Sequence, residues 1–307
     1  MILTEKNYVK KLNCNLFKIQ HRGGKGVYGI DRFKQVIKLV TEANSHSKLY
    51  FFTNKGKVFT YPFYKIPSQT INAQGIPINN LIGIESDDDV CAVRALFDAD
   101  FDRKDYFLTF LTKKGLVKKT KISDFKTVNR DGKIAIRLRS HDKLISVIII
   151  SSNDFVVISS SIGRLCIFSN DEIKPQSRHA QGLKGINCGG GVATFLNKID
   201  FKQEGFLLLM TNLGYGKKIL LSLQKVNHRT NKGFVFIKQS SKVNNIIKFV
   251  CQVFNNKSIL IATKQGKFIK VIASELSERK VKTALGTKIL NLELGDELRT
   301  AVLLQND

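Results

Sequence analysis

Phe110-Leu111-Thr112-Lys113-Lys114-Gly115 is the stretch of sequence that decides the fold, because its pattern occurs six times along the chain. Two apolar or small residues are followed by Thr or Ser, two variable residues and Gly, which predicts a strand ending in a tight hairpin turn. In the first copy Asn7 replaces the glycine, and Asn tolerates a left-handed turn better than most residues. The copies lie at residues 2–7, 51–56, 110–115, 158–163, 209–214 and 261–266.

A second glycine follows each copy at a nearly constant distance. The copies end 49, 59, 48, 51 and 52 residues apart, and the second glycine comes 17 to 20 residues later. A joint repeat of about 50 residues indicates a propeller-type or solenoid architecture, in which each unit is a small sheet that needs its neighbours. The second glycines are Gly26, Gly75, Gly132, Gly182, Gly233 and Gly286.

We call Asn7 and the glycine that ends each later copy the first landmarks, and the second glycines the second landmarks. The segments between these landmarks have the composition of strands. They are short, β-branched or aromatic, and bounded by turn-forming residues, as in 49–52, 106–110, 144–150, 155–158, 206–209 and 234–237. Four prolines and no long 3.6-residue hydrophobic period leave little room for helices. We therefore predict an all-β fold in which residues 1–307 form one domain, a propeller-like ring of six four-stranded blades. The expected blades are approximately 1–48, 49–105, 106–153, 154–204, 205–257 and 258–307.

The heptapeptide Gln20-His21-Arg22-Gly23-Gly24-Lys25-Gly26 is the strongest candidate for a binding site. It places two fixed cations among three glycines on one predicted turn. Glycine lets the main chain approach a ligand closely, while Arg and Lys form charge-assisted hydrogen bonds with phosphate oxygens. On local chemistry alone, a plain solvated turn is the commoner explanation of such a segment.

Together with the six-fold repeat, this heptapeptide resembles the seven-residue box of the C-terminal domain found in the A subunit of DNA gyrase, whose commonest form is Gln-Arg-Arg-Gly-Gly-Lys-Gly. His21 departs from that form, because a second basic residue is usual at its position. The resemblance covers the whole chain and implies the family's six-bladed β-pinwheel. It also implies that the domain binds duplex DNA and wraps it with positive writhe, which lets gyrase introduce negative supercoils. In that case the box, Gln20 to Gly26, contacts DNA.

The resemblance assigns the chemistry of the parent enzyme to other parts of it. In gyrase the strand-cutting tyrosine lies in the N-terminal part of the A subunit, whereas the B subunit hydrolyses ATP. We therefore expect a non-catalytic chain without a metal site or cofactor, with ATP and Mg²⁺ used elsewhere in the parent enzyme. The expected partners are double-stranded DNA, bound largely without sequence preference, the remainder of the gyrase A subunit, and the gyrase B subunit.

The charge of the chain indicates a polyanionic partner. Fifty Lys and Arg against 25 Asp and Glu give a formal net charge of +25, far beyond what solubility requires. Many of the cations recur just after the first or near the second landmark of a repeat, so we predict that they form a basic belt of phosphate contacts. The belt comprises Lys10, Lys11, Lys57, Lys118, Lys119, Lys121, Arg130, Lys133, Arg164, Arg178, Lys184, Lys217, Lys218, Arg229, Lys232, Lys267 and Lys270.

Other kinds of site have weak sequence support. The five cysteines form no Cys-x-x-Cys pair and are predicted to be buried free thiols in a reducing compartment. The run Gly189-Gly190-Gly191 lacks a following Lys-Ser or Lys-Thr and is predicted to be a turn. The acidic run Asp87-Asp88-Asp89, near Glu85, is predicted to be a solvated loop that repels DNA. The longest apolar run, 144–150, is too short for a membrane span, so the expected location is the cytoplasm, in association with the nucleoid.

Three functions remain open from the sequence. The first is the DNA-wrapping domain of gyrase, which the box favours over the related decatenating enzyme. The second is a free-standing architectural protein that bends and compacts DNA, which would require that the 307 residues be made alone. The third is a propeller that binds a protein or an acidic polysaccharide and shows no preference for duplex DNA.

Overall fold

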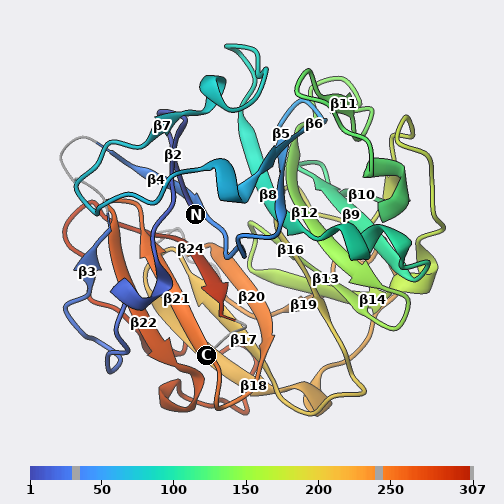
Figure 1. The fold of residues 1–307 in the computed structure, drawn as a ribbon. Helices are drawn as coiled ribbons and strands as arrows, with labels where there is room; N and C mark the ends of the chain where they lie inside the picture. The colour runs from blue at the N-terminus through green and yellow to red at the C-terminus, as the bar shows by residue number, and fades with distance from the viewer. Residues whose placement is uncertain (30–34, 239–244, 305–307) are drawn as a thin grey trace.

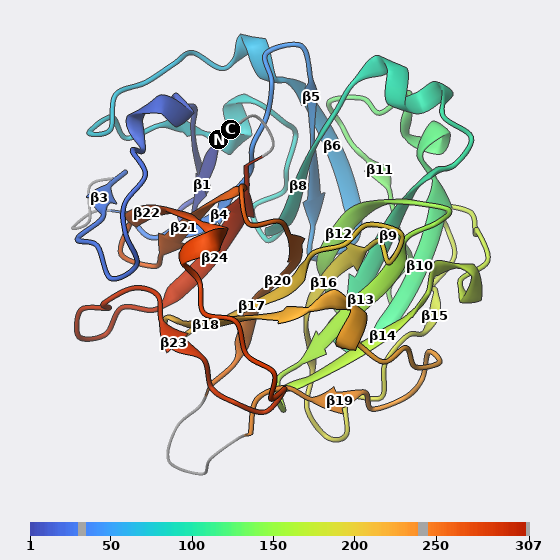
Figure 2. The same ribbon diagram turned by 90° about the horizontal axis from the view of Figure 1, so that it is seen from below.

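The computed structural model of the chain describes residues 1–29, 35–238 and 245–304, which form six four-stranded antiparallel sheets. The sheets follow one another around a central axis, so the colour in Figure 1 passes around the molecule from blue through green to orange. Ile2 and Leu304 belong to one cluster of buried apolar residues, so the two terminal segments pack together, as the view from below in Figure 2 illustrates. This arrangement confirms the predicted propeller of six blades.

We number the blades 1 to 6 in chain order and give the strands of each from the axis outward. Blade 1 contains β4 (Ile37–Val40), β1 (Ile2–Thr4), β2 (Tyr8–Lys10) and β7 (Ile76–Pro77), and blade 2 contains β8 (Val90–Leu96), β5 (Lys48–Thr53), β6 (Lys57–Pro62) and β11 (Lys133–Ile134). Blade 3 contains β12 (Leu144–Ser151), β9 (Tyr106–Thr112), β10 (Leu116–Lys121) and β15 (Leu183–Lys184), and blade 4 contains β16 (Ala193–Ile199), β13 (Phe155–Ser160), β14 (Arg164–Ser169) and β19 (Phe234–Val235). Blade 5 contains β20 (Ile247–Val253), β17 (Phe206–Thr211), β18 (Tyr215–Leu220) and β23 (Thr287–Lys288), and blade 6 contains β24 (Leu298–Leu303), β21 (Ser258–Thr263), β22 (Lys267–Ile272) and β3 (Val27–Tyr28).

The outermost strand of every blade comes from a different repeat than the other three. In blade 2, for example, β11 follows Gly132 and lies in the segment that supplies the inner strands of blade 3. Blade 6 receives β3 from the N-terminal segment, which closes the ring. The predicted blade ranges therefore hold three strands of each sheet, and the fourth strand lies in the range that follows. The second glycine of each repeat marks the point where the chain crosses to the preceding blade.

Both sets of predicted turns are present. All twelve landmark positions, including Asn7, have φ between 60° and 97°. In blades 1, 2, 3 and 6 the threonine completes the hairpin through its side chain: Thr53 Oγ1, for example, accepts a hydrogen bond from Lys57 N at 3.3 Å, and Thr112 Oγ1 one from Leu116 N at 3.2 Å. The hydroxyls of Ser160 and Thr211 make no such bond. The Thr-x-x-Gly spacing thus places a hydroxyl acceptor at the start of the second strand of the hairpin.

The core lies between neighbouring blades, where the predicted apolar strands pack face to face. Phe52 of blade 2 and Phe110 of blade 3, for instance, meet edge to face with ring centroids 5.8 Å apart, an arrangement that aromatic rings favour. The predicted strand 234–237 is shorter than expected: β19 ends at Val235, and the buried Phe236 and Ile237 donate their backbone N–H groups to Gly163 O.

The helices in the described residues are short 3₁₀ turns. They are η1 (Cys14–Leu16), η2 (Phe63–Lys65), η3 (Ile78–Asn80), η4 (Asp98–Asp102), η5 (Ile122–Phe125), η6 (Asn170–Glu172), η7 (Leu221–Leu223) and η8 (Ala273–Glu275). Within the ranges given above, no helix has the length and apolar character needed to cross a membrane.

Substitution of a landmark glycine tests the packing of the ring. At Gly56, where φ is +85°, an added Cβ would lie 2.3 Å from Ile136 O. We expect Gly56→Ala to cost about 1 to 2 kcal/mol for the left-handed backbone and about 1 to 3 kcal/mol more for the clash. Gly295→Ala is the control, because Gly295 has φ +77° and an open Cβ position. Urea unfolding of both variants should show the larger loss at Gly56, and equal losses would contradict the packing described here.

Candidate nucleic-acid interface

The predicted box forms a closed loop at the outer edge of blade 6, between η1 and β3. The side chain of Gln20 closes the loop, since its Oε1 accepts a hydrogen bond from Gly26 N at 2.9 Å. Gln20 N donates to Lys270 O of β22 at 2.8 Å, and Gly23 N donates to Ile289 O, just after β23, at 2.7 Å. The loop is therefore attached to the outer edges of two neighbouring blades.

A carboxylate from η8 holds the backbone of this loop. Glu275 Oε2 accepts a hydrogen bond from Arg22 N at 3.0 Å, and Glu275 Oε1 lies 2.8 Å from His21 Nδ1. The backbone hydrogen bond from Arg22 and the contact with His21 lower the pKa of the Glu275 carboxyl. Arg22 Nη1 donates to Ser277 Oγ at 3.1 Å, and both Arg22 and Lys25 are exposed. The loop thus presents two cations to solvent on a braced backbone.

Glu275 was missed by the sequence analysis, and it contacts His21, the residue that departs from the usual form of the box. The imidazole contacts this acid while its side chain stays 94% exposed, so the residue at position 21 anchors the loop to η8. One signal in the sequence could have indicated its role. Glu172 occupies the equivalent place in blade 4, at the end of η6, as Glu275 does at the end of η8.

Six residues of the predicted basic belt are buried, and their prediction as surface contacts is wrong. Three of them are Lys10, Lys118 and Lys217, which follow the first landmark by three positions in blades 1, 3 and 5. Their side chains point beneath the loops of the outer edge. Lys118 Nζ donates to Ala135 O at 2.6 Å, Ser177 O at 3.1 Å and Arg178 O at 2.8 Å. The relative exposures of these three residues are 0%, 0% and 1% for Lys10, Lys118 and Lys217.

The other three buried belt residues are Lys119, Lys218 and Lys270. Lys119 and Lys218 hold the 3₁₀ turn of the following blade: Lys119 Nζ donates to Asn170 O at 2.9 Å, and Lys218 Nζ donates to Ala273 O at 3.1 Å. A strand alternates its side chains between the two faces of a sheet, and in a propeller both faces pack against other blades. Cations on these strands therefore enter the interior and bond to carbonyl groups there.

The remaining belt residues lie at the surface to different extents. The four that are fully exposed are Lys121, Arg130, Lys184 and Lys232, and those partly buried are Lys11, Lys57, Lys133, Arg164, Arg178, Arg229 and Lys267. Three outermost strands carry a lysine at this edge: Lys133 in β11, Lys184 in β15 and Lys288 in β23. The accessible positive charge thus follows the outer strands and their loops.

The acidic run also differs from its prediction. Asp88 is 3% exposed, while Asp87 pairs with Lys55, Asp89 pairs with Lys38, and Glu85 lies 2.6 Å from Lys57 Nζ. The run is therefore held and neutralised by lysines, and Lys57 is engaged with Glu85. Among the described residues, no group of three or more His, Cys, Asp or Glu could hold a metal ion.

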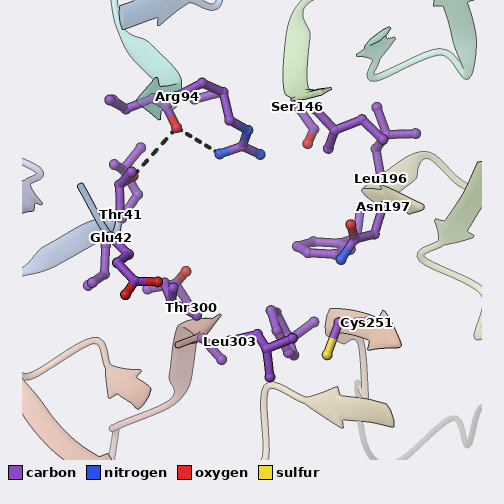
Figure 3. Close-up of a pocket in the computed structure, with 18 of the residues that line it drawn as sticks. Thr41, Glu42, Arg94, Ser146, Leu196, Asn197, Cys251, Thr300 and Leu303 are labelled. Carbon is purple, nitrogen blue, oxygen red and sulfur yellow. Dashed lines mark hydrogen bonds between the residues drawn. The ribbon is translucent and has the colours of Figure 1, made fainter. Parts of the chain in front are cut away.

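A central pocket lies on the ring axis, away from the outer edge. Figure 3 shows side chains from or next to all six innermost strands around it, including Glu42, Arg94, Asn197 and Thr300. Cys251 also faces this space in Figure 3. Cys166 and Cys251 are buried and Cys91 and Cys188 partly so, but Cys14 is exposed, which contradicts the prediction that all five are interior residues.

Sequence comparison gives matches along the whole ring. The family described as DNA gyrase C-terminal domain, beta-propeller, matches residues 1–35, 47–94, 107–151, 154–192, 205–237 and 257–305. The DNA gyrase A subunit of Staphylococcus epidermidis is 30% identical over 308 aligned residues, which cover 99% of this chain and 34% of that protein. The DNA gyrase A subunit of Staphylococcus aureus is 31% identical over 96% of this chain and 33% of its own length. The chain thus spans about a third of these relatives.

Structure comparison gives the same assignment of the fold. A structure of the DNA gyrase A C-terminal domain superposes with a TM-score of 0.86 and 26% identity, covering 99% of this chain and 98% of that one. The C-terminal domain of DNA topoisomerase IV superposes with a TM-score of 0.74 and 20% identity over 99% and 92% of the two chains. The second likeness shows a shared fold alone.

The buried lysines give the ring a testable pH dependence. Burial lowers the pKa of Lys118 to about 7 from its ordinary value of 10.5. Between about pH 7 and 10 the unfolded chain then holds a proton that the folded chain has released, so raising the pH stabilises the fold by about 1.4 kcal/mol per pH unit. In urea unfolding, the parent should gain about 2 kcal/mol over Lys118→Met between pH 7.5 and 9.

Lys121→Met is the matched control, because Lys121 lies on the same strand and is exposed. Its difference from the parent should not change over this pH range. A difference between the parent and Lys118→Met that stays constant with pH would mean that the three carbonyl groups keep the ammonium charged.

Proposed function

This chain belongs to the DNA gyrase C-terminal domain family, and we propose that it binds duplex DNA along the outer edge of its blades and wraps it with positive writhe. One observation carries the proposal: the box loop is braced by Glu275 and by two blades, with Arg22 and Lys25 turned to solvent. Lysines on three outermost strands continue this positive edge around the ring.

The physical requirements of wrapping agree with this surface. Duplex DNA has a persistence length of about 150 bp, so bending it around a small ring must be offset by many phosphate contacts. Dispersed Lys and Arg side chains supply such contacts without reading base sequence. A braced loop adds a fixed direction, since the backbone that carries its two cations is held in place. We infer that the box loop sets the path and the other cations supply affinity.

In the parent protein, the wrapped DNA would be presented to the remainder of the gyrase A subunit, which cuts the strands, and to the gyrase B subunit, which hydrolyses ATP. The proposed role of this chain is then non-catalytic and needs no cofactor of its own. It supports negative supercoiling by a gyrase that acts in the cytoplasm on nucleoid DNA.

Topology measurements test the wrapping directly. Nicked circular DNA ligated in the presence of the 307-residue chain should show a positive change in linking number after the protein is removed. Binding that leaves the topoisomer distribution unchanged at saturation would contradict wrapping. Complete loss of binding in the presence of heparin, without any preference for duplex DNA, would instead support an acidic-polymer ligand.

The double variant Arg22→Ala, Lys25→Ala tests the role of the box loop. It should abolish most of the linking-number change while weakening binding by only a few kcal/mol, because two charge-assisted contacts of about 1.5 to 3 kcal/mol each are lost from many. The measurements are topoisomer analysis and fluorescence anisotropy with duplex DNA.

Lys104→Ala, Lys202→Ala is the matched control, since both lysines are exposed and lie on turns away from the box loop. It removes the same charge and should lower affinity only slightly, through the long-range potential, without removing the positive writhe. Equal topoisomer shifts for both double variants would mean that the heptapeptide is only a turn.

A further inference from the structure

We propose that the loop 227–233, with the adjacent turn Gly189–Gly191, is a second phosphate-binding clamp for duplex DNA, built like the box loop and located at blade 4. The inference rests on the proposed function, because it names a second site for the same DNA. Four features of the two loops agree, and a fifth belongs to the second loop alone. The closing hydrogen bond of Gln20 has no counterpart, because the buried Asn227 Oδ1 accepts no hydrogen bond from the described residues.

The first feature is sequence. The loop reads Asn227-His228-Arg229-Thr230-Asn231-Lys232-Gly233, so an amide, His, Arg, Lys and Gly occupy the same places as in the box. The two central glycines of the box are replaced by Thr230 and Asn231, which hides the likeness from a search for Gly-Gly. Lys232 is exposed and Arg229 is partly buried.

The second feature is the backbone. Thr230 has φ +74° where Gly23 has φ +78°, and Gly233 has φ +73° where Gly26 has φ +70°. A β-branched residue in this region is a rare outlier, and such strain persists where the surroundings impose the conformation, often at functional sites. The second loop thus adopts the same left-handed backbone at this position as the box, although it has Thr230 where the box has a glycine.

The third feature is attachment to the blades. Asn227 N donates to Ile167 O at 2.6 Å, as Gln20 N does to Lys270 O. Thr230 N donates to Gly185 O at 2.8 Å, just after β15, and this bond corresponds to that from Gly23 to the residue after β23. The second loop therefore spans the outer edges of blades 4 and 3 as the box loop spans those of blades 6 and 5.

The fourth feature is the acidic brace. Glu172 Oε2 accepts a hydrogen bond from Arg229 N at 3.0 Å, the distance found between Glu275 and Arg22, and Glu172 Oε1 lies 3.5 Å from His228 Nδ1. Each brace stands on a 3₁₀ turn that a buried lysine holds from behind, Lys119 for η6 and Lys218 for η8. In both loops a buried lysine holds the 3₁₀ turn, an acid on that turn holds the loop, and the loop carries an Arg and a Lys.

The fifth feature is the triple-glycine turn, which the proposed box site does not use. Asn187 N donates to Asn231 O at 3.0 Å, which ties this turn to the loop. A Cβ at Gly189 would lie 3.9 Å from the Lys232 side chain, and one at Gly190 would meet nothing within 4 Å. An exposed backbone without side chains lies next to the lysine, so a phosphate group can approach both closely.

The other four loops of the outer edge lack this construction. Loops 69–75, 176–182 and 280–286 have Gln or Leu in the place of Lys25, and their carbonyl groups bond to the buried Lys10, Lys118 and Lys217. Loop 126–132 has Asp131 in that place, and the 3₁₀ turn η2 offers it Lys65 instead of an acid. Two clamps, separated by blade 5, would hold the DNA at two points of its path.

The experiment compares three double variants of the 307-residue chain: Arg229→Ala, Lys232→Ala; Arg22→Ala, Lys25→Ala; and the control Lys104→Ala, Lys202→Ala. The second-clamp variant should reduce the linking-number change of ligated circles about twofold or more, since one of two linked contacts is lost. Thr230→Gly, which relieves the left-handed threonine, should keep the parent's linking-number change and raise the melting temperature. Circular dichroism melting confirms that each variant is folded.

Lysine acetylation, read by mass spectrometry with and without a short duplex, gives a second readout that does not depend on wrapping. DNA should protect Lys25 and Lys232 more than Lys104 and Lys202. A parent that protects both clamp lysines but leaves the linking number unchanged would overturn wrapping and keep the second clamp. Protection of Lys25 without Lys232, together with a second-clamp variant that behaves like the control, would overturn the second clamp alone.

Discussion

Hydrogen bonds from buried lysine ammonium groups to backbone carbonyls are the interactions on which the outer edge of this ring depends. The protonated amine of Lys118 has three donors, and its Nζ contacts Ala135 O in its own repeat and Ser177 O and Arg178 O in the next. Carbonyl groups at a crossing loop have no strand partner, and burial without a partner would cost free energy. The lysine satisfies them and fixes the loop, at the cost of desolvating its charge. Buried lysines therefore fix the conformation of loops that form the outer surface of the ring.

The tandem lysines of β10 and β18 divide this work between their two faces. The first lysine of each pair bonds to carbonyls of the loop at its own blade's outer edge, and also to one carbonyl just after the outermost strand of the preceding blade. The second lysine holds the 3₁₀ turn of the next blade. Where blades 4 and 6 have Cys166 and Ile269 in place of the first lysine, their loops carry an exposed cation instead. Between blades 3 and 6, a blade with a buried first lysine therefore alternates with a blade whose loop is braced by an acid.

The sequence contained enough to predict the architecture but only part of the surface. The landmarks were predictable because a positive φ restricts a position to Gly or Asn, and this restriction leaves a periodic trace, as at Asn7 and Gly132. Lys118 and Lys217 were misplaced because lysine is rarely buried and a count of cations cannot distinguish a carbonyl ligand from a phosphate ligand. Other repeats have Phe59 and Ile269 at the equivalent position, and these apolar residues were the sign in the sequence that the position is buried. Glu275 left no periodic trace, since most of the other 3₁₀ turns lack an acid at its place.

The formal charge of +25 and the number of possible phosphate contacts are different quantities. A buried ammonium such as Lys217 still adds to the long-range potential that draws DNA toward the ring, but it cannot release a counterion from a phosphate, because release requires contact. Lys57 is likewise engaged with Glu85. Affinity and its salt dependence should therefore follow the exposed cations of the outer strands and loops, whereas the path of the DNA should follow the few cations whose backbone is braced. Braced cations lose little freedom on binding and so can oppose the elastic force of a bent duplex.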